Sequence, residues 1–201
     1  MSTQKQVTEE DIREVLDAKP RLSLPFKLAL YFSKPVVDRR YGSVWFWRPE
    51  DRDKLLSLEP ELKKKGVITE TVVIGDHMLE GSDNRAVRLA AARAGADAVL
   101  IINGVSAVDR FNNALAYSYC LLVTPLVVAG TEADGLFLMN ASLWDVRNQY
   151  LYLSVDSEGT AKDIKPAVFV NEKRVVLSAK SAARDALVRE LASRLARLGA
   201  K

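Results

Sequence analysis

The chain has 201 residues, of which 48% are hydrophobic and 27% charged, and this suits one globular domain of ordinary size. Its formal net charge of +3 is too small to indicate a nucleic-acid-binding protein. One cysteine, Cys120, excludes an intrachain disulfide, and one histidine, His77, excludes a histidine-rich metal site. We therefore predict a single domain over 1–201, with a helical extension over 1–20 and no metal or cofactor.

The first third of the chain predicts a helix and one or two strands. Thr8 is a plausible N-cap for a helix over 8–18, and Lys19-Pro20 ends it. The apolar block over 24–33 predicts a central strand, and 44–47 could extend a strand. In such a strand Trp45 and Trp47 share one face. Core packing explains that face most simply, and we retain both residues as candidate interface residues.

The middle of the chain alternates helices with apolar strands. A helix over 50–65 is divided or kinked by Pro60, and a β-branched strand follows over 67–74. Ser82-Asp83 caps a helix over 84–94, and a buried strand follows over 98–103. This order predicts a parallel three-stranded core with right-handed crossovers. The helix should bury five residues and expose three, namely Ala86, Val87, Leu89, Ala90 and Ala94, against Arg85, Arg88 and Arg93.

Residues 111–131 carry no charge, yet polar residues interrupt them too often for a membrane-spanning helix. Two buried strands, or a strand and a loop, divided near Thr124-Pro125, are the better interpretation. A strand here would have a second face that is small and nearly neutral, which suits a contact with another surface. We therefore expect self-association or a protein partner, with Tyr117, Tyr119 and Leu122 as candidate interface residues.

The last third predicts an antiparallel hairpin and a long helix. The connection 147–149 is short enough only for a hairpin between 136–146 and 149–155. In the helix over 175–198 a stripe at steps of four should pack on the sheet, and basic residues should face outward. The stripe is Ala179, Ala183, Leu187, Leu191 and Leu195, and the basic side is Lys180, Arg184, Arg189, Arg194 and Arg197. The fold class is thus α/β, a mixed sheet with a parallel βαβαβ core, an antiparallel hairpin and a long C-terminal helix.

No catalytic constellation stands out. Residues 75–83 hold acidic, imidazole and hydroxyl groups, but their adjacency in sequence does not make them converge, and a solvated connection is the simpler interpretation. We expect no catalytic residue and no enzyme activity. The alternative is a small-ligand binder or enzyme that uses the carboxyl ends of the parallel strands. The polar residues there are Ser33, Asp38, Arg39, Arg40, Asp76, His77, Asn103, Asp109 and Arg110.

Four segments resemble a known family: 24–30 (LPFKLAL), 95–101 (GADAVLI), 126–130 (LVVAG) and 141–152 (ASLWDVRNQYLY). In the order of its elements, the chain from about 20 to 198 resembles rhombotarget-type envelope lipoproteins. More broadly, it resembles the α/β domain of the TolB amino-terminal domain and the curli-secretion lipoproteins. The resemblance implies an accessory protein of the bacterial envelope, and it supplies no catalytic residues that could be transferred to this chain.

The resemblance also implies a compartment and a mode of action. We expect a non-enzymatic protein that acts through protein–protein contact, in secretion or surface assembly. It would face the periplasm and be tethered at the outer membrane by a lipid anchor. No export signal or lipidated cysteine is seen near Met1. Either both precede this chain in the native protein, or the protein is cytoplasmic.

Overall fold

The computed structural model describes residues 8–35, 45–112, 131–165 and 172–199. In chain order its elements are α1 (Glu9–Asp17), β1 (Phe26–Phe32), α2 (Pro49–Leu56), α3 (Glu59–Lys64), β2 (Ile68–Ile74), the 3-10 turn η1 (Asp76–Met78), α4 (Asn84–Arg93), β3 (Ala98–Asn112), β4 (Thr131–Asp145), β5 (Leu151–Lys165) and α5 (Glu172–Leu198).

One mixed sheet organises the described residues, and its strand order is β2-β1-β3-β4-β5. β1 pairs in parallel with β2 and with β3, while β3–β4 and β4–β5 are antiparallel. The predicted fold class is therefore confirmed, including the hairpin and the long C-terminal helix. The hairpin strands are longer than predicted, because β3, β4 and β5 each run for 15 residues.

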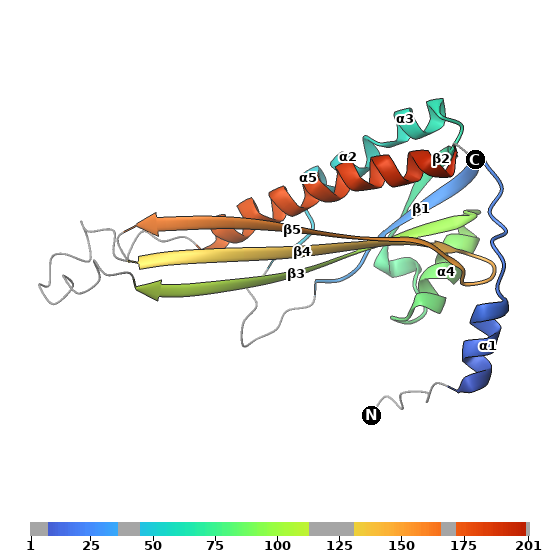
Figure 1. Ribbon diagram of the computed structural model, residues 1–201, viewed down its shortest axis with the longest axis horizontal. Coiled ribbons are helices and arrows are strands. Elements are labelled where there is room, and N and C mark those ends of the chain that lie inside the picture. Colours follow the sequence, from blue (N-terminus) through green and yellow to red (C-terminus); the bar gives the residue numbers. More distant parts are fainter. Residues whose placement is uncertain (1–7, 36–44, 113–130, 166–171, 200–201) are drawn as a thin grey trace, which may run out of the picture.

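Helices cover the two faces of the sheet unequally (Figure 1). α5 lies along β4 and β5, with α2 and α3 beside it. The predicted stripe on α5 is confirmed, since Ala179, Ala183, Leu187, Leu191 and Leu195 are at most 1% exposed. α4 covers the opposite face, where Ala90 and Ala91 pack near Ala29 and Val99. β3 thus has buried side chains on both faces within the body of the molecule.

Beyond that body, β3, β4 and β5 continue as a three-stranded arm (Figure 1). α5 covers one face of the arm, where Phe137 and Met139 are buried. The other face, which we call the open face, carries large apolar side chains that are 36% to 51% exposed, namely Val105, Leu136 and Leu138. The sheet therefore changes from three layers in the body to two layers in the arm.

Three local predictions are wrong. Residues 45–47 form no strand. On α4, Leu89 is 43% exposed while Ala91 is buried, and Arg88 is half-buried because it donates to the carbonyl of Val146 at 3.2 Å. On α5, Lys180 does not lie on the basic outer side but is 2% exposed.

The N-terminal helix and the divided helix are confirmed. α1 begins with a capping box, in which Thr8 accepts from the Asp11 amide at 3.2 Å and donates its own amide to the Asp11 carboxylate at 2.8 Å. The predicted helix over 50–65 is two helices, α2 and α3, and Pro60 sits in the first turn of α3.

Candidate functional site

The carboxyl ends of the parallel strands border a crevice of about 490 Å³ on the face that α4 covers. β1 and β3 are neighbours whose following connections leave in opposite directions, and ligands favour this position in open α/β sheets. Tyr31 and Ser33 enter from the end of β1, and Ile101 and Asn103 from β3. The connection between β2 and α4 forms one wall.

The crevice has an aromatic and hydroxyl side built by β1 and β4. Trp144 of β4 is half-buried, and its indole N–H donates to the Ser142 hydroxyl at 2.9 Å. The Tyr31 hydroxyl donates to the Asp76 carboxylate at 3.0 Å. Burial, followed by this hydrogen bond and the nearby negative charge, raises the pKa of Tyr31 to about 12. Tyr31 therefore stays neutral throughout the physiological range.

The start of α4 contributes hydrogen-bond acceptors to the crevice, and a carboxylate of the protein already occupies the position where an anion could bind. Asp83 is the N-cap of α4, and its carboxylate accepts from the Ala86 amide at 2.9 Å. The next residue, Asn84, has a buried side-chain oxygen, Oδ1, that accepts no hydrogen bond. The charged groups lining the crevice are Asp76 and Asp83 against Lys34, so carboxylates outnumber cations.

A second hollow of about 510 Å³ lies on the open face of the arm and shares Asn103 with the crevice. Val105 and Leu138 pair across β3 and β4, and Leu138 pairs with Glu158 of β5. Asn140 donates to Asp156 at 2.9 Å. The open face thus offers apolar side chains bordered by carboxylates.

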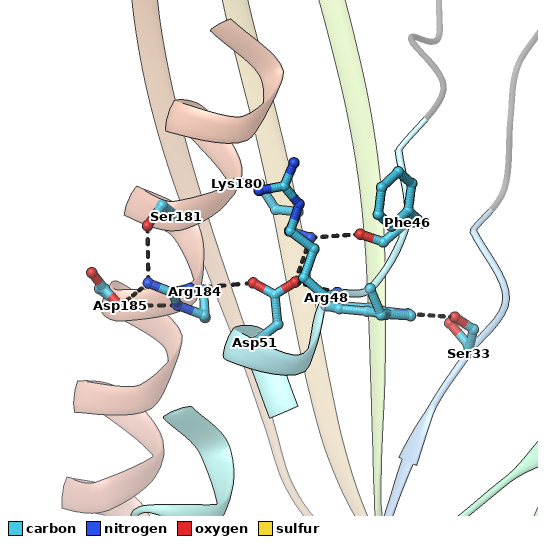
Figure 2. A network of polar contacts seen from close by, with 9 residues as sticks. Ser33, Phe46, Arg48, Asp51, Lys180, Ser181, Arg184 and Asp185 are labelled. Carbon is cyan, nitrogen blue, oxygen red and sulfur yellow. Dashed lines mark hydrogen bonds and ion pairs between the residues drawn. The ribbon is translucent and has the colours of Figure 1, made fainter. Parts of the chain in front are cut away.

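On the face of the sheet that α5 covers, a buried charge network joins α2 to α5 (Figure 2). Asp51 pairs with Lys180 and with Arg184, and the side chains of Asp51 and Lys180 are 2% exposed. Lys180 also donates to the carbonyl of Phe46 at 2.7 Å. Burial lowers the pKa of Lys180, although the hydrogen bond and the charge of Asp51 oppose the shift. Lys180 and Arg184 both find their hydrogen-bond partners within the chain, so the network holds α2 and α5 together.

The candidate interface residues fall in two places. Tyr117, Tyr119 and Leu122 lie outside the described residues. Trp45 is a core residue, 3% exposed, whose ring packs edge-on against Phe137 with centroids 4.8 Å apart. Trp47 is half-buried and donates to the carbonyl of Ser33 at 2.7 Å. Phe46, between them, is 59% exposed and is the aromatic side chain of this run that a partner could reach.

The structure brings three of the predicted carboxyl-edge residues to the crevice: Ser33, Asp76 and Asn103. His77 is exposed next to Asp76. Asp38, Arg39 and Arg40 lie outside the described residues. Asp109 and Arg110 lie further along β3, opposite Asp134 and Ala133 in register.

The sequence did not indicate Ser142 and Trp144 as crevice residues. They reach it because Ser142 pairs with Ile101, and Trp144 with Val99, in the antiparallel register of β3 and β4. That register follows from the long strand pairing and cannot be read from local patterns. The alternation of Ser142 and Trp144 along one strand was the available signal.

Within the described ranges, no group of three or more metal-ligating side chains converges. Among the described helices, none is both long and apolar enough to span a lipid bilayer.

No protein-family model matches the sequence, and no curated protein matches it either. Several solved structures are similar in fold. A putative neuraminyllactose-binding hemagglutinin homolog from Helicobacter pylori has 10% identity and a TM-score of 0.44, covering 89% of this chain and 92% of that one. The PelC dodecamer from Paraburkholderia phytofirmans has 13% identity and a TM-score of 0.36, covering 88% and 92%. Lipoprotein GNA1162 from Neisseria meningitidis has 13% identity and a TM-score of 0.35, covering 83% and 99%.

Bacterial lipoproteins are thus among the structures that this chain resembles. At these identities and TM-scores the likeness says nothing about an activity or a partner. A function for this chain therefore has to rest on its own residues.

Proposed function

We propose that this chain is a non-enzymatic accessory protein of the bacterial cell envelope that acts through protein–protein contact, with the open face of the arm as its contact surface. The single observation that carries the proposal is a cluster of exposed apolar side chains on the open face, in which Leu136 of β4 is 36%, Leu138 of β4 is 46% and Val105 of β3 is 51% exposed. A sheet face of this kind gains free energy when a second surface removes it from water.

The tip of the arm supports the same proposal. Asn112 at the end of β3 pairs with Thr131 at the start of β4, so the segment 113–130 joins these two strand ends. That segment contains no charged residue. The sequence between these strand ends therefore carries no charge that would oppose a contact, and this composition supports the same proposal. The predicted interface residues Tyr117, Tyr119 and Leu122 belong to this segment and remain a proposal.

A direct test places one charge on the open face. Leu138→Asp should leave the fold intact, because the side chain points to solvent, and should weaken association, because an unpaired charge is costly at a contact. Leu89→Asp on α4 is the matched control, since Leu89 is 43% exposed but lies away from the arm. Sedimentation velocity at low and high protein concentration measures self-association of all three proteins.

A photoreactive amino acid at position 138, with position 89 as control, tests whether the open face contacts a protein other than a second copy of this chain in the native cell. A wild type that stays monomeric at high concentration and gives no crosslink specific to position 138 would contradict the contact function.

The envelope location has its own test. We expect the native gene to encode an export signal and a lipidated cysteine ahead of this chain, so that the mature protein faces the periplasm. Reading the upstream codons and fractionating the native cell check this. A protein found only in the cytoplasm would overturn the location while leaving the contact surface to be judged separately.

The crevice favours a second candidate function, the binding of a small ligand. Its volume of about 490 Å³ lies within the range of about 300–1,000 Å³ typical of ligand pockets, and it occupies the carboxyl edge of the parallel strands. This function does not exclude the contact function, because the crevice and the apolar part of the arm are different surfaces.

A further inference from the structure

We propose that the crevice at the carboxyl end of β1, beside Ile101 and Asn103 of β3, binds a neutral saccharide unit. This inference goes beyond protein contact and rests on the second candidate function, ligand binding in the crevice.

An anionic ligand is disfavoured by the charges in place. The first turn of α4 could have bound a phosphate through its amides, but the carboxylate of Asp83 already accepts from the Ala86 amide. Asp76 adds a second carboxylate to the same wall, and Lys34 is the one cation among the lining residues. A phosphate or carboxylate would meet net repulsion in this crevice.

A hydroxyl-rich ligand fits the acceptors that the crevice offers. The Oδ1 atom of Asn84 is buried and accepts nothing from the protein, so a ligand hydroxyl that displaced the side chains over it would satisfy a costly buried group. The Asn103 amide and the Ser142 hydroxyl line the same space and can each donate and accept. Paired amides, hydroxyls and carboxylates match the mixed donor and acceptor pattern of a sugar ring.

An apolar surface beside these groups fits the carbon face of a sugar. The Trp144 indole lines the crevice while its N–H turns to Ser142, which leaves the ring for packing. Tyr31 lies on the same side and stays neutral because it donates to Asp76. Aromatic rings supply large contact area with little loss of side-chain entropy on binding.

The experiment uses the whole chain and three probes: chitobiose and cellobiose as neutral disaccharides, and inorganic phosphate as an anion. Binding is followed by backbone amide NMR shifts over 75–84 and by tryptophan fluorescence. The chain has three tryptophans, and Trp45 and Trp47 pack on the opposite face, so the Trp144→Phe difference spectrum isolates the crevice signal. We expect at least one disaccharide, and not phosphate, to shift both signals.

Asn84→Ala separates a binding role from a structural one. Because Asn84 Oδ1 has no partner, its removal should leave the thermal midpoint of the free protein unchanged or raise it. The same change should weaken disaccharide binding about tenfold, as expected for the loss of a buried hydrogen bond. Asn140→Ala is the control, since Asn140 faces the same side of the sheet one strand away but does not line the crevice.

The possible results decide between the proposals. Disaccharide binding that Asn84→Ala leaves unchanged, or a loss of thermal stability in that variant, would overturn the assigned site. Shifts caused by phosphate and not by sugars would overturn the saccharide class but keep ligand binding in the crevice. No shift with any probe would overturn both, while the contact function would still be judged by sedimentation.

Discussion

At the scale of single residues, a buried ion network joins Asp51 to Lys180 and Arg184. Asp51 lies in the first turn of α2, and its carboxylate accepts from the amide of Arg48 at 2.9 Å. It therefore both caps α2 and pairs with the charges of Lys180 and Arg184 on α5. The Lys180 ammonium lies 5.5 Å from the Trp47 ring centroid and 5.6 Å from that of Trp45. The two tryptophans therefore line the pocket that holds this charge.

Asp51→Asn should be strongly destabilising, because it leaves Lys180 without a carboxylate in a buried site, while Arg184 keeps its pair with Asp185. We expect a loss of about 3–5 kcal/mol in the free energy of unfolding, measured by urea denaturation. Adding Lys180→Met should restore part of the lost stability, since it removes the ammonium group that Asp51→Asn leaves unpaired. Glu190→Gln is the control: its pair with Arg194 is nearly half-exposed and should contribute less than about 1 kcal/mol. Equal effects of Asp51→Asn and Glu190→Gln would show that the network is not buried in solution.

Tyr31 should ionise at a higher pH than an ordinary tyrosine. Its raised pKa of about 12 means that the folded state keeps the phenol proton when an unfolded tyrosine loses it near pH 10. This contribution to stability is full below pH 10 and is lost as pH rises from about 10 to 12. The difference in absorbance at alkaline pH between wild type and Tyr31→Phe measures the ionisation, and Asp76→Asn should shift it to lower pH. An ionisation of Tyr31 near pH 10 would argue against the Tyr31–Asp76 hydrogen bond.

At the scale of elements, the arm depends on how closely α5 approaches β5. A side-chain carbon at Gly159 would overlap the carbonyl oxygen of Ala179 and the amide nitrogen of Ala183, far inside van der Waals contact. Glycine on the strand and alanines on the helix therefore let the two backbones meet. The same helix reaches Gly135 of β4 through Val175.

Gly159→Ala should destabilise the protein by about 1–3 kcal/mol, because backbone atoms cannot move aside as a flexible side chain can. Glu158→Ala, one residue earlier on the open face, is the matched control and should change stability by less than about 0.5 kcal/mol. Urea denaturation measures both. A Gly159→Ala variant as stable as wild type would mean that α5 is displaced from β5 at little cost.

Periodicity predicted most helices and strands, and their order predicted the parallel core and the hairpin, but side-chain contacts between distant segments could not be predicted. The stripe from Ala179 to Leu195 and the uninterrupted apolar strand 98–102 were correctly placed, since each is set by its own neighbours in sequence. Lys180 was misplaced because its burial depends on Asp51 and on the two tryptophans, more than 120 residues away. The crevice was predicted in part for the same reason: parallel strand ends are local features, whereas Trp144 enters through a long-range register.

At the scale of the whole molecule, the body and the arm should differ in local stability. In the body, β3 has packed side chains on both faces, and Leu100 and Val99 are at most 1% exposed. In the arm, one face lies against α5 and the other is open. Segments with few buried contacts open locally at lower free energy than the core.

Hydrogen exchange measured at low protein concentration should therefore be graded along β3 and β4. Amides over 98–102 and 141–145 should exchange last, through global unfolding, whereas those over 108–112 and 131–134 should exchange earlier through local opening. Gly159→Ala should speed exchange in the arm more than in the body, because it loosens the packing of α5 on the arm. At high concentration the arm alone should gain protection if copies associate through the open face, since a second surface would then cover it. Protection that is uniform along β4 in the monomer would contradict the two-layer arm, and with it the argument that its open face is available for a partner.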